Sequence, residues 1–213
     1  MHFSNWLIFC GIALLVTFSP GPAVLLAISN SLVVGPRRAM ISSLGNATGL
    51  FVVSGVAMAG MGAVLATSAT AFMGLKIVGA LYLIYLGIKQ LSSKASALAD
   101  VKAESAAANL HTAPRLFSHG LTVALTNPKA ILFFSAFFPQ FLIHDASIFG
   151  QYFVLTTTFV ACALLSHVFY VLLARVLKKQ FARPHRMRLF NYVSGGLFVL
   201  LGLSLLRLRN KAA

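Results

Sequence analysis

The chain has 213 residues, of which 59% are hydrophobic and 9% are charged, and its mean hydropathy is +0.88. Soluble domains carry about 25% charged residues, so the composition excludes an ordinary soluble protein and predicts an all-α integral membrane protein. The net charge of +14 does not indicate a nucleic-acid partner, because the basic residues cluster between apolar runs, as orientation charges do in membrane proteins.

Six apolar runs are long enough for transmembrane helices, which need about 20 residues each. We expect the six helices at about 6–34, 39–66, 70–91, 116–143, 148–177 and 189–207. Residues 1–91 are predicted to form a first three-helix repeat, 92–115 a cytoplasmic linker and 116–213 a second three-helix repeat. Because three is an odd number of spans, the two repeats must enter the membrane from opposite sides, which makes them inverted repeats.

The first run is broken in its middle by Ser19-Pro20-Gly21-Pro22. Proline has no N–H group, so the carbonyls one turn earlier lose their helical partners. Broken backbone at membrane depth is tolerated mainly where it lines a cavity, and in transporters it often binds the substrate. We therefore expect Ser19, Pro20, Gly21 and Pro22 to be substrate-binding, with half-helix N–H groups attracting a carboxylate and freed carbonyls accepting from an ammonium group. The alternative is a kink that serves packing alone.

The second run contains Gly45-Asn46-Ala47-Thr48-Gly49, a GxxxG spacing that permits close approach of helices. We interpret the glycines as a packing surface, either between the two halves of the chain or in a homodimer. Asn46 lies on the same run and is expected to line the substrate cavity.

A second break lies in the fourth run at Asn127-Pro128-Lys129, and its flanks resemble those of the first break. Two proline-interrupted spans at corresponding positions point to a transporter binding site, so all three residues are candidates for substrate binding. Lys129 is costly in a span, by about 2.5–3.5 kcal/mol on insertion scales. Its role is left open between a substrate carboxylate, capping of a freed carbonyl, and proton coupling.

His167 in the fifth run is a second candidate for proton coupling, because an unperturbed imidazole titrates near neutral pH; a core histidine is the alternative. Cys10 and Cys162 are single and lie in apolar runs, without metal-binding spacing or a CxxC motif. We expect no metal and no cofactor. A thiol oxidoreductase would require the first and fifth spans to touch. A passive channel or a structural subunit is a further alternative.

Motifs that carry a family resemblance lie along most of the chain. They are Ser19-Pro20-Gly21-Pro22 followed by Gly35 and Arg38, the stretch Gly79–Gly87, the stretch Leu125–Phe134 with Phe138-Pro139-Gln140-Phe141, and Gly195-Gly196 with Gly202. With these motifs the sequence resembles the LysE/RhtB family of amino-acid exporters, which includes translocators of neutral amino acids, homoserine, threonine and leucine. The resemblance implies a secondary exporter of amino acids or their derivatives that works by proton antiport. The chain departs from the family at Ala23, where Asn or Asp is frequent, and in a fifth span without acidic residues.

The basic residues of the short loops predict the orientation. They lie in loops one, three and five, which we therefore expect on the cytoplasmic side of a bacterial inner membrane, with both termini outside. Expected partners are a small amino-acid substrate, protons and membrane lipid. The sequence thus predicts a non-enzymatic transporter.

Overall fold

The computed structural model describes residues 3–19, 21–67, 69–92, 112–143, 147–181 and 184–207, and helices are the only regular structure in these ranges. The helices are α1 (Phe3–Phe18), α2 (Pro22–Val34), α3 (Pro36–Thr67), α4 (Ala69–Ser92), α6 (Ala113–Thr126), α7 (Pro128–Leu132), the π-helix η1 (Phe133–Phe137), the 3-10 helix η2 (Phe138–Phe141), α8 (Ile148–Phe181) and α9 (Pro184–Arg207). The all-helical prediction is confirmed for these residues. The linker expected at 92–115 falls largely on residues 93–111, outside the described ranges.

Membrane-spanning length and composition are met by two single helices, Pro36–Gly60 and Ile148–Ala174. Two bent pairs meet them jointly: Phe3–Phe18 with Pro22–Val34, and Ala113–Thr126 with Pro128–Phe141. The described chain therefore has two to four candidate spans, while α4 and α9 contain shorter apolar stretches. The membrane fold is confirmed, and six spans in two inverted repeats remain a prediction.

Both predicted breaks are present, with bends of 53° and 49°. At the first break Gly21 is extended (φ −172°, ψ 177°) and Pro22 begins α2. At the second, Asn127 is extended (φ −72°, ψ 107°) and Pro128 begins α7. Proline suits the first helical position because its missing N–H has no helical partner there. Pro20 lies outside the described residues.

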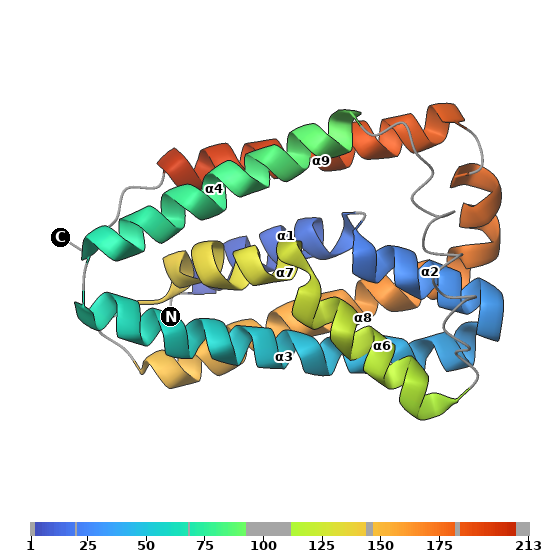
Figure 1. Ribbon diagram of the computed structural model, residues 1–213, viewed down its shortest axis with the longest axis horizontal. Helices are drawn as coiled ribbons and strands as arrows, with labels where there is room; N and C mark the ends of the chain where they lie inside the picture. Colours follow the sequence, from blue (N-terminus) through green and yellow to red (C-terminus); the bar gives the residue numbers. More distant parts are fainter. Residues whose placement is uncertain are drawn as a thin grey trace.

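Three helix pairs build the arrangement in Figure 1. α4 and α9 lie along each other as a layer on one side, α6 packs against the first part of α3, and α1 packs beside α8. The starts of α3, α6 and α9 lie at one end of the molecule (right in Figure 1). The starts of α1 and α8 and the end of α9 lie at the opposite end.

Glycines allow the closest of these approaches. Gly45 and Gly49 of α3 meet Phe117 and Ala124 of α6, where an added Cβ would collide with α6 atoms. The GxxxG prediction is thus confirmed as packing between the two halves of the chain. The same glycines are covered by α6, so they do not form the dimer surface that the sequence left open.

Aromatic side chains fill the core on the α1 and α8 side of the second break. Phe9 packs against Phe133 and Phe138, with ring centroids 5.9 Å apart in each pair, and Phe133 stacks on Phe159 at 4.4 Å. Large apolar side chains also cover much of the outer surface; examples are Phe3, Val56, Phe149 and Leu172, each 68–71% exposed. An apolar exterior of this extent is consistent with contact to lipid.

Candidate functional site

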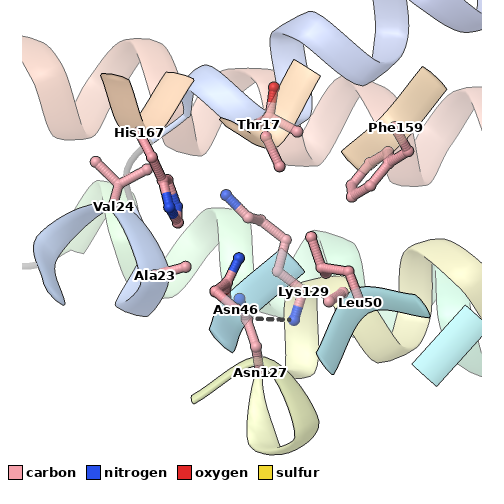
Figure 2. Close-up of a pocket in the computed structure, with 11 residues that line it drawn as sticks. Thr17, Ala23, Val24, Asn46, Leu50, Asn127, Lys129, Phe159 and His167 are labelled. Atoms are coloured by element: carbon pink, nitrogen blue, oxygen red, sulfur yellow. Dashed lines mark hydrogen bonds between the residues drawn. The ribbon is translucent and has the colours of Figure 1, made fainter. Parts of the chain in front are cut away.

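A small cavity of about 30 Å³ lies between the two breaks and α3 and α8. Its lining residues are Thr17, Ala23, Val24, Asn46, Leu50, Asn127, Lys129, Ala130, Phe159, Ala163 and His167. Figure 2 shows Lys129, Asn46 and His167 directed into the same space from three different elements. Since one buried water needs about 10–15 Å³ on this scale, the cavity holds about two waters, and an amino acid must widen it.

Lys129 joins the two breaks directly. Its Nζ donates to the carbonyl oxygens of Val16 and Ser19, at 2.9 Å each, and to Ser19 Oγ at 3.2 Å. It also lies 5.7 Å from the ring centroid of Phe198 on α9. A cation at the C-terminal end of a helix is stabilised by the helix dipole and satisfies carbonyls that have no helical donor. The capping role considered for Lys129 is therefore present in the structure.

Two side chains of α8 cap the remaining carbonyls at the end of α1. Ser166 Oγ donates to the Thr17 carbonyl at 2.9 Å, and the Tyr170 hydroxyl donates to the Phe18 carbonyl at 2.7 Å. The carbonyls expected to be free for a substrate ammonium group are thus bound by protein donors. Sequence reasoning missed Ser166 and Tyr170, although their spacing of four residues places both on one helical face.

Asn127 caps the helix after the second break. Its Oδ1 accepts from the Lys129 backbone N–H at 3.1 Å, and its own N–H donates to the Ala124 carbonyl at 3.3 Å. This is the N-cap arrangement that Asn favours. Because Asn127 also lines the cavity, it both fixes the start of α7 and faces the space beside Lys129.

Two polar atoms at the cavity residues have no hydrogen-bond partner. Asn46 Oδ1 and His167 Nδ1 are buried and unpartnered, with the two side chains 3% and 4% exposed. Buried polar groups are nearly always hydrogen-bonded. Both side chains line the cavity, so they are candidates to bind a ligand or water there, and the choice between proton coupling and a core histidine for His167 stays a prediction.

The other predicted site residues lie at the two breaks, beside Lys129 or at the starts of α2 and α7. Ser19 binds Lys129, and a Cβ at Gly21 would lie 3.2 Å from Lys129 Nζ. Pro22 and Pro128 form the first turns of α2 and α7 and set the direction of the chain there. Pro20 lies outside the described residues.

An apolar wall completes the cavity and was not predicted. Leu50, Phe159 and Ala163 contribute to it from α3 and α8. No signal in the sequence distinguishes these side chains from the many other apolar ones. Within the described ranges no cluster of His, Cys, Asp or Glu could hold a metal ion.

The ionisable side chains that line the cavity are basic, and none is acidic. The acidic residues of the whole chain are Asp100, Glu104 and Asp145, and none of them falls on a described residue. Of the side chains that line the cavity, Lys129 and His167 are titratable. An anion that reaches this space meets the half-buried ammonium group of Lys129 and no carboxylate of the described chain.

Two broken helices that meet at a cavity are typical of one class of membrane protein, the transporters whose substrate sites lie at discontinuous helices. The family model for LysE type translocators matches residues 14–209. The chain belongs to this family, which confirms the resemblance seen in the sequence and makes the protein a transporter and not an enzyme.

Curated relatives match over most of the chain. The homoserine/homoserine lactone efflux protein of Salmonella typhimurium is 33% identical over 202 residues, which cover 95% of this chain and 96% of that protein. An uncharacterised membrane protein of Bacillus subtilis is 30% identical, with 95% and 98% covered. The leucine efflux protein of Salmonella typhimurium is 32% identical, with 68% of each chain covered. No solved structure gave a significant match.

The thiol oxidoreductase alternative required the first and fifth spans to touch. α1 and α8 do pack together, and Trp6 Nε1 donates to Thr158 Oγ1 at 3.1 Å. Cys10 and Cys162 are nevertheless free thiols, and the family is one of translocators. The cysteines are therefore interpreted as half-buried packing residues.

Proposed function

We propose that the protein exports small neutral amino acids or their derivatives from the cytoplasm of a bacterial cell. The observation that carries this proposal is the cavity in which Lys129 of one broken span contacts the end of the other. The efflux of homoserine, homoserine lactone and leucine named for the relatives supports the cargo class. The apolar wall at Leu50 and Phe159 suits an uncharged side chain, and a lysine or arginine cargo would find no carboxylate in the described cavity.

Two inverted three-helix repeats, 1–91 and 116–213 around a linker at 92–115, are the architecture that we propose. The pairing of α4 with α9 supports it. A Cβ at Gly87 would lie 2.7 Å from the carbonyl of Gly195, and a Cβ at Gly202 would lie 2.7 Å from the carbonyl of Ala80. The stretch Leu75–Gly87 resembles Phe190–Gly202 in sequence, and this alignment pairs Ala80 with Gly195 and Gly87 with Gly202. The two contacts therefore exchange with each other, as a two-fold axis requires.

The other helix pairs support the same axis. α1 and α8 run parallel, since Trp6 meets Thr158 and Thr17 meets Ser166. α3 and α6 also run parallel, because Gly45 and Gly49 meet successive turns of α6. If the axis relates α1 to α6 and α3 to α8, it also relates the α1–α8 contact to the α3–α6 contact. Such a pseudo-symmetry supplies inward-open and outward-open states of similar energy for alternating access.

We propose an inner-membrane orientation with the odd-numbered loops in the cytoplasm. Arg37 and Arg38 lie in the first turn of α3 and Arg115 in the first turn of α6, two helices that begin at the same end of the molecule (Figure 1). Lys89 lies in the last turn of α4, and an excess of Lys and Arg marks cytoplasmic loops. Arg207, in the last turn of α9, lies at the opposite end of the molecule and is the one basic residue named here that does not fit this orientation. The homodimer considered from the sequence stays a prediction.

Proton antiport is the proposed energy source, with Lys129 and His167 as the coupling groups. His167 is buried and Lys129 is half-buried beside the cavity, and titratable groups inside a membrane protein are usually functional. Net export then requires the cavity to exchange a proton for the cargo on each cycle.

Everted membrane vesicles test the proposal. Vesicles that contain the protein, loaded with an acidic interior, should accumulate labelled leucine, homoserine or threonine, and a protonophore should abolish the accumulation. Vesicles with a folded His167→Ala variant should lose the gradient dependence. No uptake of any neutral amino acid by folded wild-type protein would contradict the proposal. Uptake without counterflow would indicate a passive channel.

A further inference from the structure

The C-terminal end of α1 is a cation-binding position that the protein itself occupies. The carbonyls of Val16 and Ser19 and the hydroxyl of Ser19 converge on Lys129 Nζ at 2.9–3.2 Å. Carbonyls at this end of a helix carry the negative end of its dipole. They are therefore an acceptor set for any ammonium group, including the α-ammonium group of an amino acid.

The half-buried ammonium group of Lys129 lacks an anionic partner among the described residues, because all three acidic residues of the sequence fall outside them. A buried charge without a counter-charge is poised to pair with an incoming anion. A cargo carboxylate supplies such an anion.

We infer that cargo and Lys129 exchange places: the cargo ammonium group takes the acceptors of Val16 and Ser19, and the cargo carboxylate pairs with the displaced Lys129 ammonium group. This inference rests on the proposed export of amino acids and assigns the preferred cargo as a zwitterion with a free α-carboxylate. Lys129 is then the residue that determines specificity for the carboxylate.

The surroundings of Lys129 permit the exchange. Its side chain is an unbranched four-carbon stem, and Gly21 leaves the space beside Nζ open, since a Cβ there would come within 3.2 Å. Asn46 Oδ1 and His167 Nδ1 face the same cavity without partners. The cavity of about 30 Å³ holds about two waters, so cargo enters only when Lys129 vacates part of the site.

The exchange predicts how analogues behave. An amide or a lactone lacks the carboxylate and leaves the displaced Lys129 unpaired, whereas a hydroxy acid lacks the ammonium group and leaves the α1 carbonyls without a donor. Leaving a buried polar group unpaired weakens binding by about 5- to 150-fold. Each analogue should therefore compete about fivefold or more less well than the parent amino acid.

Counterflow into proteoliposomes that contain purified wild-type protein tests whether cargo and Lys129 exchange places. Labelled leucine is the cargo, with leucine, leucinamide and 2-hydroxyisocaproate as competitors, and a parallel series compares homoserine with homoserine lactone. We expect the amide, the lactone and the hydroxy acid to be at least about fivefold weaker than the amino acid. Equal potency of acid and amide, or of homoserine and its lactone, would overturn the inference and leave the proposed export intact. No counterflow of any neutral amino acid would refute the proposed export, and with it the inference.

Variants locate the effect. Lys129→Met should bring the ratio of acid to amide potency close to one, and Lys129→Arg should keep a preference for the acid. Lys89→Met is the matched control, because Lys89 is exposed in the last turn of α4, and its ratio should equal that of wild type. A folded Lys129→Met protein with the wild-type ratio would overturn the inference. If that variant does not fold, the wild-type comparison of acid and amide still decides.

Discussion

Replacing Gly195 with alanine is expected to destabilise the protein, whereas the same change at the neighbouring Gly196 is expected to stabilise it. A Cβ at Gly195 would lie 2.7 Å from the Gly87 carbonyl and 2.7 Å from Leu91 Cγ, while nothing lies within 4 Å of one at Gly196. Both positions are inside α9, where alanine is favoured over glycine by about 1 kcal/mol.

Overpacking offsets this gain at Gly195 alone. Forcing extra atoms into a packed interior is destabilising by about 1–3 kcal/mol, and a backbone carbonyl of α4 cannot move aside as a flexible side chain can. The net change is then a loss of up to about 2 kcal/mol at Gly195 and a gain of about 1 kcal/mol at Gly196. At about 2–4 °C per kcal/mol for a chain of this size, Tm should fall by up to about 8 °C in the first variant and rise by about 2–4 °C in the second.

Thermal unfolding of the purified variants in detergent measures both shifts. Gly87→Ala and Gly202→Ala should each lose stability as Gly195→Ala does, because the two contacts of α4 with α9 are reciprocal. Equal shifts at Gly195 and Gly196, or a gain at both, would refute the close packing of α4 on α9.

Two further substitutions probe the first break. Tyr170→Phe removes the donor to the Phe18 carbonyl and should lower the free energy of unfolding by about 0.6–1.7 kcal/mol, the range of hydrogen bonds between membrane helices. The control Tyr85→Phe, at an exposed tyrosine, should leave it unchanged. A similar loss in both variants would contradict the capping of the Phe18 carbonyl by Tyr170. Gly21→Ala crowds Lys129 Nζ and should lower the free energy of unfolding of the wild-type protein by about 0.5–1 kcal/mol. In a Lys129→Met background the same substitution should have no effect. Equal losses in the two backgrounds would show that Gly21 and Lys129 are not coupled.

The two breaks were predictable because they follow from backbone chemistry. Proline removes an N–H wherever it stands, so Pro22 and Pro128 mark helix starts without knowledge of the neighbours. Asn127 next to Pro128 is likewise a local N-cap signal. The contacts made by these breaks are another matter. Lys129 meets carbonyls 110 and 113 residues away, and the sequence therefore left its role open among three possibilities.

Other features of the structure depend on packing or on helix ends. We did not predict that the half-helix after Pro128 would change to the π-helix η1 and the 3-10 helix η2, although Pro139, which has no N–H group, is a local signal against a continuous α-helix. α9 begins at Pro184 and not near Leu189, because we placed its start where the apolar run begins, and a helix can continue past its apolar part into charged residues. Ser166 and Tyr170 were missed because their partners belong to α1.

The central claim is that cargo binds in the cavity beside Lys129. In a protein with Cys10 and Cys162 replaced by serine, Ala23→Cys places one thiol on a residue that lines the cavity, and Thr112→Cys places one at an exposed position before α6. The measurement is the rate at which a small methanethiosulfonate reagent labels each thiol with and without saturating cargo. The account predicts that cargo slows labelling at position 23 several-fold and leaves position 112 unchanged. Equal labelling rates at position 23 in both conditions, in a variant that still transports, would contradict it.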